Sequence, residues 1–127
     1  MEKRSMRLLW MGLLILFVAE STVFAAEFNR LIGRWQRQDG GYLIEIRNVA
    51  PDGRIVANYF NPRPINVSTA QASLAKGYIK PDIELRDIGY PGSRYTLVYD
   101  LKSDRLIGLY YHAVSRQNFD VVFVRQR

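Results

Sequence analysis

The sequence contains no cysteine and a single histidine, His112, among its 127 residues. Without thiols the chain can form no disulfide, no cysteine nucleophile and no metal site shared by Cys and His. A Ser–His–acid triad would have to use His112, and no serine lies in the setting of a nucleophile elbow. Glycine-rich phosphate loops are also missing, because Gly40-Gly41 is a bare turn. We therefore expect a protein that is not an enzyme and that uses no metal and no cofactor.

Clustered positive charge is also scarce. Lys and Arg number 18 against 12 Asp and Glu, a net charge of +6. In the body of the chain these cations stand singly between apolar residues, except in the closing Arg125-Gln126-Arg127. A nucleic-acid surface usually shows clustered cations interleaved with aromatic residues. We expect a moderately basic surface that binds no nucleic acid and attracts anionic lipid or polysaccharide only weakly.

The one long apolar run lies near the N-terminus. A cationic start precedes the apolar residues 8–19, and small residues follow up to Ala25. This order is typical of a secretory signal peptide cleaved after Ala25. An uncleaved anchor is disfavoured, because the run is shorter than the roughly 20 residues that a span prefers and ends at Glu20. We expect a signal peptide at residues 1–25 and one domain at residues 26–127, without a stable membrane span, in the bacterial periplasm or secreted.

Beyond residue 31, short apolar runs alternate with turn signals. Tyr42, Ile44 and Ile46 share one parity, as in a half-buried strand. Asp-Gly, Asn-Pro and Pro-Gly clusters separate the runs and predict successive antiparallel hairpins. The expected strands comprise residues 32–38, 42–49, 55–60, 65–76, 78–87, 94–101, 106–113 and 119–125.

Two of these strands carry ambiguities. Residues 68–76 are rich in alanine, which leaves a helix open as the alternative to a strand. If they form a strand, Ile65, Val67, Thr69 and Gln71 share one face. Pro81 is expected as a break or an edge position, because proline cannot donate to a β-ladder.

The short connections determine the expected fold class. Hairpins in succession make an antiparallel up-and-down meander, and a meander of about eight strands removes its exposed edges by closing into a barrel. We therefore predict an all-β, eight-stranded meander barrel, with a two-sheet β-sandwich as the alternative. The interior of such a barrel is either filled by side chains or just holds one small ligand. The sequence leaves these two possibilities open.

Three short motifs suggest a relationship to known barrels. Gly33-x-Trp35 opens the first expected strand, Asp52-Gly53 turns the next hairpin, and residues 93–97 (Ser-Arg-Tyr-Thr-Leu) belong to a later strand. In these motifs and in its layout the chain resembles the avidin-like and lipocalin-like barrels, in which the tryptophan plugs the closed end. Avidins stack their ligand on several tryptophans, whereas residues 26–127 contain only Trp35, which argues against biotin. The stretch Asn61-Pro62-Arg63-Pro64 also resembles a small family of bacterial exported proteins, from which no function carries over.

Aromatic residues are abundant, with eight tyrosines and six phenylalanines. Most are expected in the core, and several tyrosines are candidates to line a barrel mouth, where each offers an apolar ring and a hydroxyl. The candidate ligand-binding residues are Tyr59, Asn61, Tyr99, Tyr110 and His112. The leading hypothesis is an exported, non-enzymatic protein that binds a small, partly apolar ligand. The alternative is a filled barrel that docks on another envelope protein or on polysaccharide, and aromatics on both faces of their strands also suggest a homodimer.

The expected signal peptide gives a direct prediction. The full chain expressed in a Gram-negative bacterium should accumulate in the periplasm with Ala26 as its first residue, as read by intact mass and N-terminal sequencing. Ala25→Arg places a charge where the peptidase requires a small residue and should leave uncleaved precursor. A wild-type protein that retains residues 1–25 in the membrane would contradict cleavage and indicate an anchor.

Overall fold

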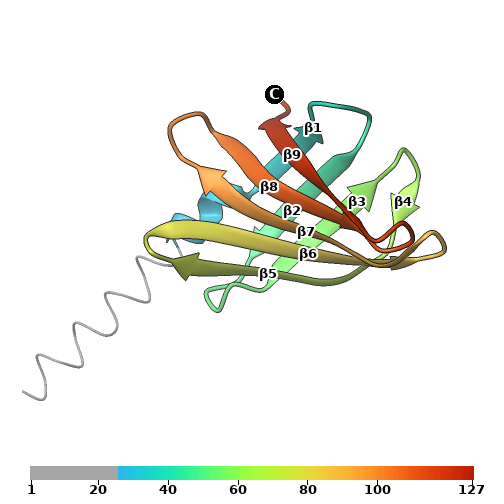
Figure 1. Ribbon diagram of the computed structural model, residues 1–127. Coiled ribbons are helices and arrows are strands. Elements are labelled where there is room, and N and C mark those ends of the chain that lie inside the picture. Colours follow the sequence, from blue (N-terminus) through green and yellow to red (C-terminus); the bar gives the residue numbers. More distant parts are fainter. Residues whose placement is uncertain (1–25) are drawn as a thin grey trace, which may run out of the picture.

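The computed structural model describes residues 26–127, so the expected signal peptide lies outside the described residues. Nine antiparallel strands form one nearly closed, barrel-shaped sheet (Figure 1). No helix in this part of the chain has the length and hydropathy needed to cross a bilayer. A short 3-10 turn, η1 (Asn29–Leu31), precedes β1 (Gly33–Arg37), β2 (Leu43–Val49), β3 (Ile55–Phe60), β4 (Pro64–Ile65), β5 (Val67–Ala75), β6 (Tyr78–Asp87), β7 (Tyr90–Asp100), β8 (Arg105–His112) and β9 (Gln117–Arg125).

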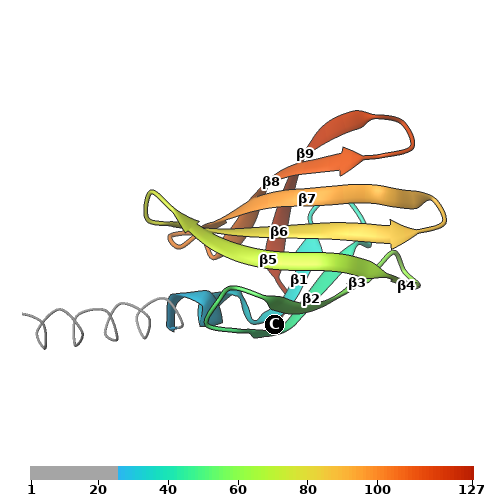
Figure 2. The same cartoon turned by 90° about the horizontal axis from the view of Figure 1, so that it is seen from below.

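The sheet is joined into one barrel by pairing between β1 and β9, the first and last strands in the sequence. The strand order is β4-β3-β2-β1-β9-β8-β7-β6-β5, and β1 pairs with β9 at Trp35↔Arg125 and Arg37↔Phe123. Strands β5 to β8 lie side by side across one side of the molecule, with β1 to β3 on the other (Figure 2). The predicted all-β antiparallel barrel is therefore confirmed, and the alternative of two separate sheets is not formed.

The nine strands reduce to the expected number of about eight, because β4 and β5 act as one interrupted strand. Both run antiparallel to β3, which pairs with β4 at Tyr59↔Ile65. Arg54, the residue before β3, forms an isolated antiparallel bridge with Gln71 of β5. Between these two points the structure shows no β3–β5 ladder. At this seam, the boundary of β3 with β4 and β5, backbone pairing is therefore present at both ends and interrupted in the middle.

The ambiguity over residues 68–76 is resolved in favour of a strand, because residues 68–75 belong to β5 and Lys76 lies in the turn that follows. The expected parity is wrong beyond Val67, because the register with β6 shifts between Val67 and Thr69. A bulge of this kind moves every later side chain to the opposite face. Thr69 and Gln71 are consequently exposed, whereas Ala72 is buried.

Pro81 neither breaks β6 nor lies on an edge of the sheet. The strand runs through it without interruption, and Pro81 is fully buried opposite Ala72 of β5. On the other side of β6, the ladder with β7 begins only at Asp82↔Thr96. The strand therefore accommodates a proline at the end of one ladder, where a missing N–H costs least.

The interior of the barrel is filled by side chains. Trp35, Ile44, Tyr95, Leu97 and Phe123 are each 0% exposed, so no water-sized space lies beside them. Close packing of this kind is normal for a protein core, and each fully buried large apolar side chain contributes about 1.5–3 kcal/mol. Of the two interiors that an eight-stranded barrel permits, this chain has the filled one.

The seam gives a stability prediction at Gly53, whose φ is +92° and whose added Cβ would lie 2.1 Å from the carbonyl oxygen of Ala72. The amide of Ala72 donates to the Gly53 carbonyl across the same seam. Gly53→Ala should lower the free energy of unfolding by about 3 kcal/mol, since the positive φ alone costs about 1–2 kcal/mol and the clash separates β5 from the turn.

Gly89→Ala is the matched control, because Gly89 shares a positive φ of 83° but has nothing within 4 Å of an added Cβ. It should lose only about 1 kcal/mol. Urea unfolding of the two variants measures the difference. Equal losses would show that contact across the seam contributes nothing to stability.

Candidate ligand-binding site

The connections between strands divide between the two ends of the barrel. The β1–β2, β3–β4, β6–β7 and β8–β9 connections lie at one end, here called the mouth end, on the right of Figure 1. The β2–β3, β5–β6 and β7–β8 connections lie with η1 at the opposite end, the η1 end. Because the interior between them is filled, a small ligand has no space inside the barrel, and each of the five predicted ligand residues lies at one of these two ends.

The η1 end is plugged by Trp35 and covered by Arg125. The indole Nε1 of Trp35 donates to the Leu31 carbonyl at 2.9 Å, and the guanidinium of Arg125 lies 4.2 Å from the Trp35 ring centroid. Arg125 also donates to the Ile32 carbonyl at 2.6 Å and to Asp104 Oδ2 at 2.8 Å. This ion pair, above all its hydrogen bond, lowers the pKa of Asp104. Trp35 is therefore fully buried at the η1 end of the barrel.

Tyr99, one of the predicted ligand residues, belongs to this plug. Its ring meets Trp35 edge-on at 6.1 Å, and its hydroxyl donates to Asp104 Oδ1 at 2.8 Å. Only 7% of Tyr99 is exposed. The structure thus separates Tyr99 from the other four candidates, which lie at the mouth end.

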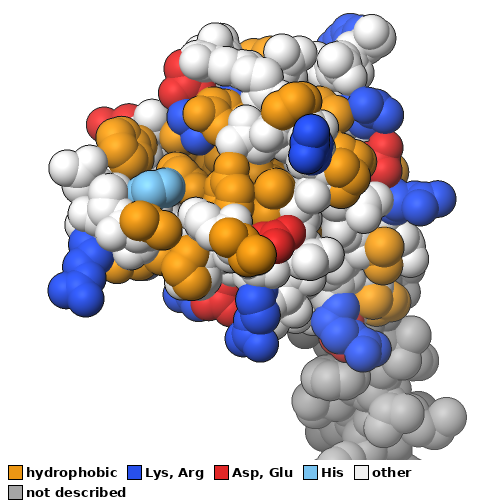
Figure 3. Space-filling view, turned by 90° about the vertical axis from the view of Figure 1, so that its right-hand side faces the viewer, with side chains coloured by type: hydrophobic (Ala, Val, Ile, Leu, Met, Phe, Trp, Pro, Cys, Tyr) orange, Lys and Arg blue, Asp and Glu red, His pale blue; other side chains and the backbone are white. Residues whose placement is uncertain are grey.

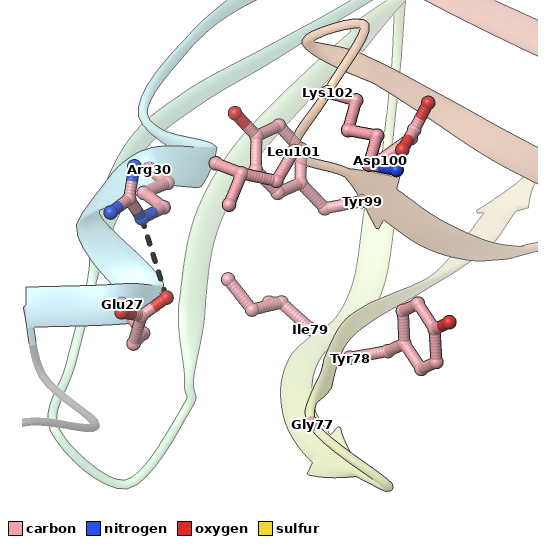
Figure 4. A pocket seen from close by; sticks show the side chains of 9 residues that line it. All are labelled: Glu27, Arg30, Gly77, Tyr78, Ile79, Tyr99, Asp100, Leu101 and Lys102. Carbon is pink, nitrogen blue, oxygen red and sulfur yellow. Dashed lines mark hydrogen bonds and ion pairs between the residues drawn. The ribbon is translucent and has the colours of Figure 1, made fainter.

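A surface depression of about 400 Å³ lies beside this plug. Figure 4 shows Glu27 and Arg30, which form an ion pair at 3.3 Å, on one side of it, with Ile79, Tyr99 and Leu101 facing them. Charges of both signs surround it, which favours no ligand of either sign. The depression also contains only one of the predicted residues.

At the mouth end, three tyrosines pack in sequence across the barrel. The ring centroids of Tyr59 and Tyr95 are 5.5 Å apart, and Tyr95 stacks on Tyr110 at 4.5 Å. The hydroxyls of Tyr59 and Tyr95 hydrogen-bond at 2.8 Å. Tyr95, which the sequence did not single out, thereby joins two of the predicted residues.

The other two candidates lie around this row. Asn61 donates from its amide to the hydroxyl of Tyr90, whose ring meets Tyr59 edge-on at 6.4 Å. The ring of His112 lies 6.1 Å from Tyr110. Its Nδ1 lies 3.2 Å from the backbone amide nitrogen of Ser115 and 2.7 Å from the Ser115 hydroxyl. Asn61 and His112 are both partly exposed at the mouth end.

Arg37 is the main residue of this site that the sequence did not reveal. It is the one buried charged side chain in residues 26–127, at 7% exposure. It donates through Nε to Asp39 Oδ1 at 2.7 Å, through Nη2 to Asp39 Oδ2 at 2.5 Å, and through Nη1 to the Tyr95 hydroxyl at 3.0 Å. Its guanidinium also lies 4.0 Å from the ring centroid of Tyr42. Its position could have been predicted from the alternation of β1, because Arg37 lies two residues after Trp35 and therefore on the same inward face.

The charges in this network are fixed at neutral pH. Burial by itself lowers the pKa of Arg37, but hydrogen bonds with Asp39 and Tyr95 outweigh it and the pKa is raised. The hydrogen bond from Arg37 lowers the pKa of Asp39. Burial raises the pKa of Tyr95 to about 12, although its hydrogen bonds oppose this, and burial also raises the pKa of Tyr59. The mouth end therefore holds a guanidinium, a carboxylate and neutral hydroxyls.

A shallow depression of about 410 Å³, here called the mouth dish, opens above this network. In the face that contains it, hydrophobic side chains gather in the middle and most Lys and Arg side chains lie around the edge (Figure 3). No group of three or more His, Asp or Glu in the described residues is placed to hold a metal ion. The dish instead offers aromatic rings and one guanidinium, and it is lined by Arg37, Asp39, Tyr42, Tyr110, His112, Ser115 and Phe119.

Comparison with known proteins adds no assignment. No protein-family model, no curated protein and no solved structure matches this chain. The function is therefore argued from the chemistry of the mouth dish.

The plug at the η1 end gives a pH prediction. Because Arg125 lowers the pKa of Asp104, the stability from this pair is present above the unfolded value of about 3.9 and is lost as pH falls through the lower folded value. Asp104→Asn should cost about 1–2 kcal/mol at pH 7, and the gap to wild type should narrow toward pH 2. Asparagine also tolerates the φ of 52° at this position.

Urea unfolding between pH 2 and pH 7 measures this gap. Asp120→Asn is the control, because Asp120 is exposed and has no ion pair in the described structure; its stability curve should run parallel to that of wild type. A gap for Asp104→Asn that stays constant down to pH 2 would contradict the assignment of the ion pair.

Proposed function

We propose that this chain is an exported, non-enzymatic binding protein that holds a small, partly apolar molecule in the mouth dish. Export rests on the signal-like residues 1–25. The filled interior leaves the ends of the barrel for recognition. Four of the five predicted ligand residues, Tyr59, Asn61, Tyr110 and His112, gather at this end. Tyr110 and His112 line the dish itself, whereas Tyr59 and Asn61 support its floor and rim through neighbouring tyrosines.

The observation that carries this proposal is the guanidinium of Arg37 at the bottom of an open dish. A buried ion pair is often no more stabilising than apolar side chains of similar volume, because both charges lose their hydration. An arginine used only to fill this end of the barrel would therefore be a poor choice for stability. Placed between aromatic rings, the same guanidinium is well suited to orient a ligand.

A second candidate function is supported by the outer face of the sheet. Val98, Ile107 and Val122 lie in one cross-strand row on β7, β8 and β9, and Leu109 is 44% exposed beside them. We call these four residues the outer band. Exposed apolar bands often mark protein interfaces, so docking on another envelope protein, or on a second copy of this chain, is the alternative function.

Two residues of the β8–β9 hairpin distinguish these functions. Phe119 is 45% exposed and lines the mouth dish, whereas Leu109 is 44% exposed on the outer band. Ligands from a panel of small aromatic acids, amides and alcohols should perturb amide NMR signals at the mouth end. Phe119→Ala should weaken the best ligand about fivefold, because one aromatic contact is worth about 1 kcal/mol. Leu109→Ala should leave its affinity unchanged.

The contrary results are equally specific. If no compound of the panel perturbs the mouth end of the wild-type protein, the proposed function is wrong. If the protein self-associates or captures a protein partner, and Leu109→Ala but not Phe119→Ala abolishes this, the outer band carries the function instead.

A further inference from the structure

The donors of Arg37 are only partly used. A guanidinium presents five N–H donors, and three of these have partners, two on Asp39 and one on Tyr95. Asp39 holds the edge formed by Nε and Nη2 in a two-pronged arrangement, the geometry in which arginine binds carboxylates most strongly. The site at the bottom of the dish is therefore already shaped for a carboxylate.

The two members of this ion pair differ in their freedom to move. The side chain of Arg37 is 8% exposed, whereas that of Asp39 is 56% exposed. Arg37 ends β1 and packs under the Tyr42 ring, but Asp39 belongs to the turn that connects β1 to β2. Asp39 can therefore rotate into water without opening the core, while Arg37 cannot. An incoming carboxylate would replace Asp39 and leave the guanidinium satisfied.

The surroundings favour an anion on a flat apolar body. The rings of Tyr42, Tyr110 and Phe119 line the dish beside the guanidinium. Arg63 and Arg116 are exposed on two other connections at the mouth end. Cations around an apolar depression raise the local concentration of anionic ligands. Aromatic rings beside a cation add contact area for a planar group.

We propose that the mouth dish binds small aromatic carboxylic acids, whose carboxylate takes the place of Asp39 on Arg37. Asp39 then acts as an internal stand-in that covers the guanidinium when no ligand is bound. This inference rests on the proposed function and adds to it the chemical class of the ligand.

The test compares 3-phenylpropanoate with its neutral amide, 3-phenylpropanamide, by NMR titration of the purified protein. The acid should perturb the mouth-end signals in a saturable way. The amide should bind at least about tenfold more weakly, because it has one acceptor oxygen instead of two and carries no negative charge to replace that of Asp39 on the guanidinium. Asp39→Asn removes the competing charge at nearly constant shape. It should tighten binding of the acid about tenfold and leave the amide unchanged.

A second variant is the control for the change in net charge that Asp39→Asn introduces. Asp87→Asn also removes one negative charge from the mouth end, but Asp87 accepts only from backbone amides, of Asn66 and Ile88. It should change affinity for the acid less than twofold. Equal gains from Asp39→Asn and Asp87→Asn would overturn the exchange on Arg37 and indicate general electrostatics.

Two further outcomes distinguish a failure of this inference from a failure of the proposed function on which it rests. If the acid and the amide bind the dish equally well in wild type and in Asp39→Asn, the anion preference is wrong while small-molecule binding stands. If neither compound, nor any in the wider panel, perturbs the mouth end in either protein, the proposed function fails and this inference fails with it.

Discussion

The arrangement of the mouth end depends on one buried charge, the guanidinium of Arg37. Removing a charge from water costs several kcal/mol unless it is paired and hydrogen-bonded. Asp39 supplies the opposite charge from the exposed turn, and the Tyr95 hydroxyl supplies a neutral acceptor from inside the barrel. The hydroxyl of Tyr95 in turn pairs with that of Tyr59. The buried polar atoms of this end are thus satisfied together, and the rings that carry them complete the filling of the barrel.

Much of the fold could be predicted from local sequence patterns, because apolar and polar residues alternate along a strand that has one buried face. Ile44 and Ile46 are buried as their alternation indicated. The bulge after Val67 was not predictable, since it depends on the register with β6 rather than on the sequence of β5. Pro81 misled for a related reason: whether its missing N–H matters depends on where a neighbouring ladder begins. The register between two strands that are distant in sequence cannot be predicted from the sequence of one of them.

The sequence predicted which tyrosines of the candidate site face inward, but not at which end of the barrel each one lies. Tyr95 and Tyr99 share the inward face of β7, yet four residues of strand separate them by about 13 Å, which places them at opposite ends of the barrel. Parity therefore identified Tyr99 as inward-facing without placing it in the plug. The burial of Arg37 was not predicted, because a single arginine in a strand is usually assigned to the solvent-exposed face of the sheet. Its inward parity with Trp35 was the contrary signal.

The interior of the barrel is filled by side chains, so a small ligand has no space inside it. Xenon binds apolar cavities that are empty of water, as shown for cavities in other proteins, and it can be followed through NMR signals of interior methyl groups. Under xenon pressure, the methyl signals of Ile44, Leu97 and Leu106, which are 0% exposed, should shift only slightly and in proportion to pressure. Saturable shifts at these methyls would reveal an interior cavity, and would move the search for a ligand from the mouth dish to the inside of the barrel.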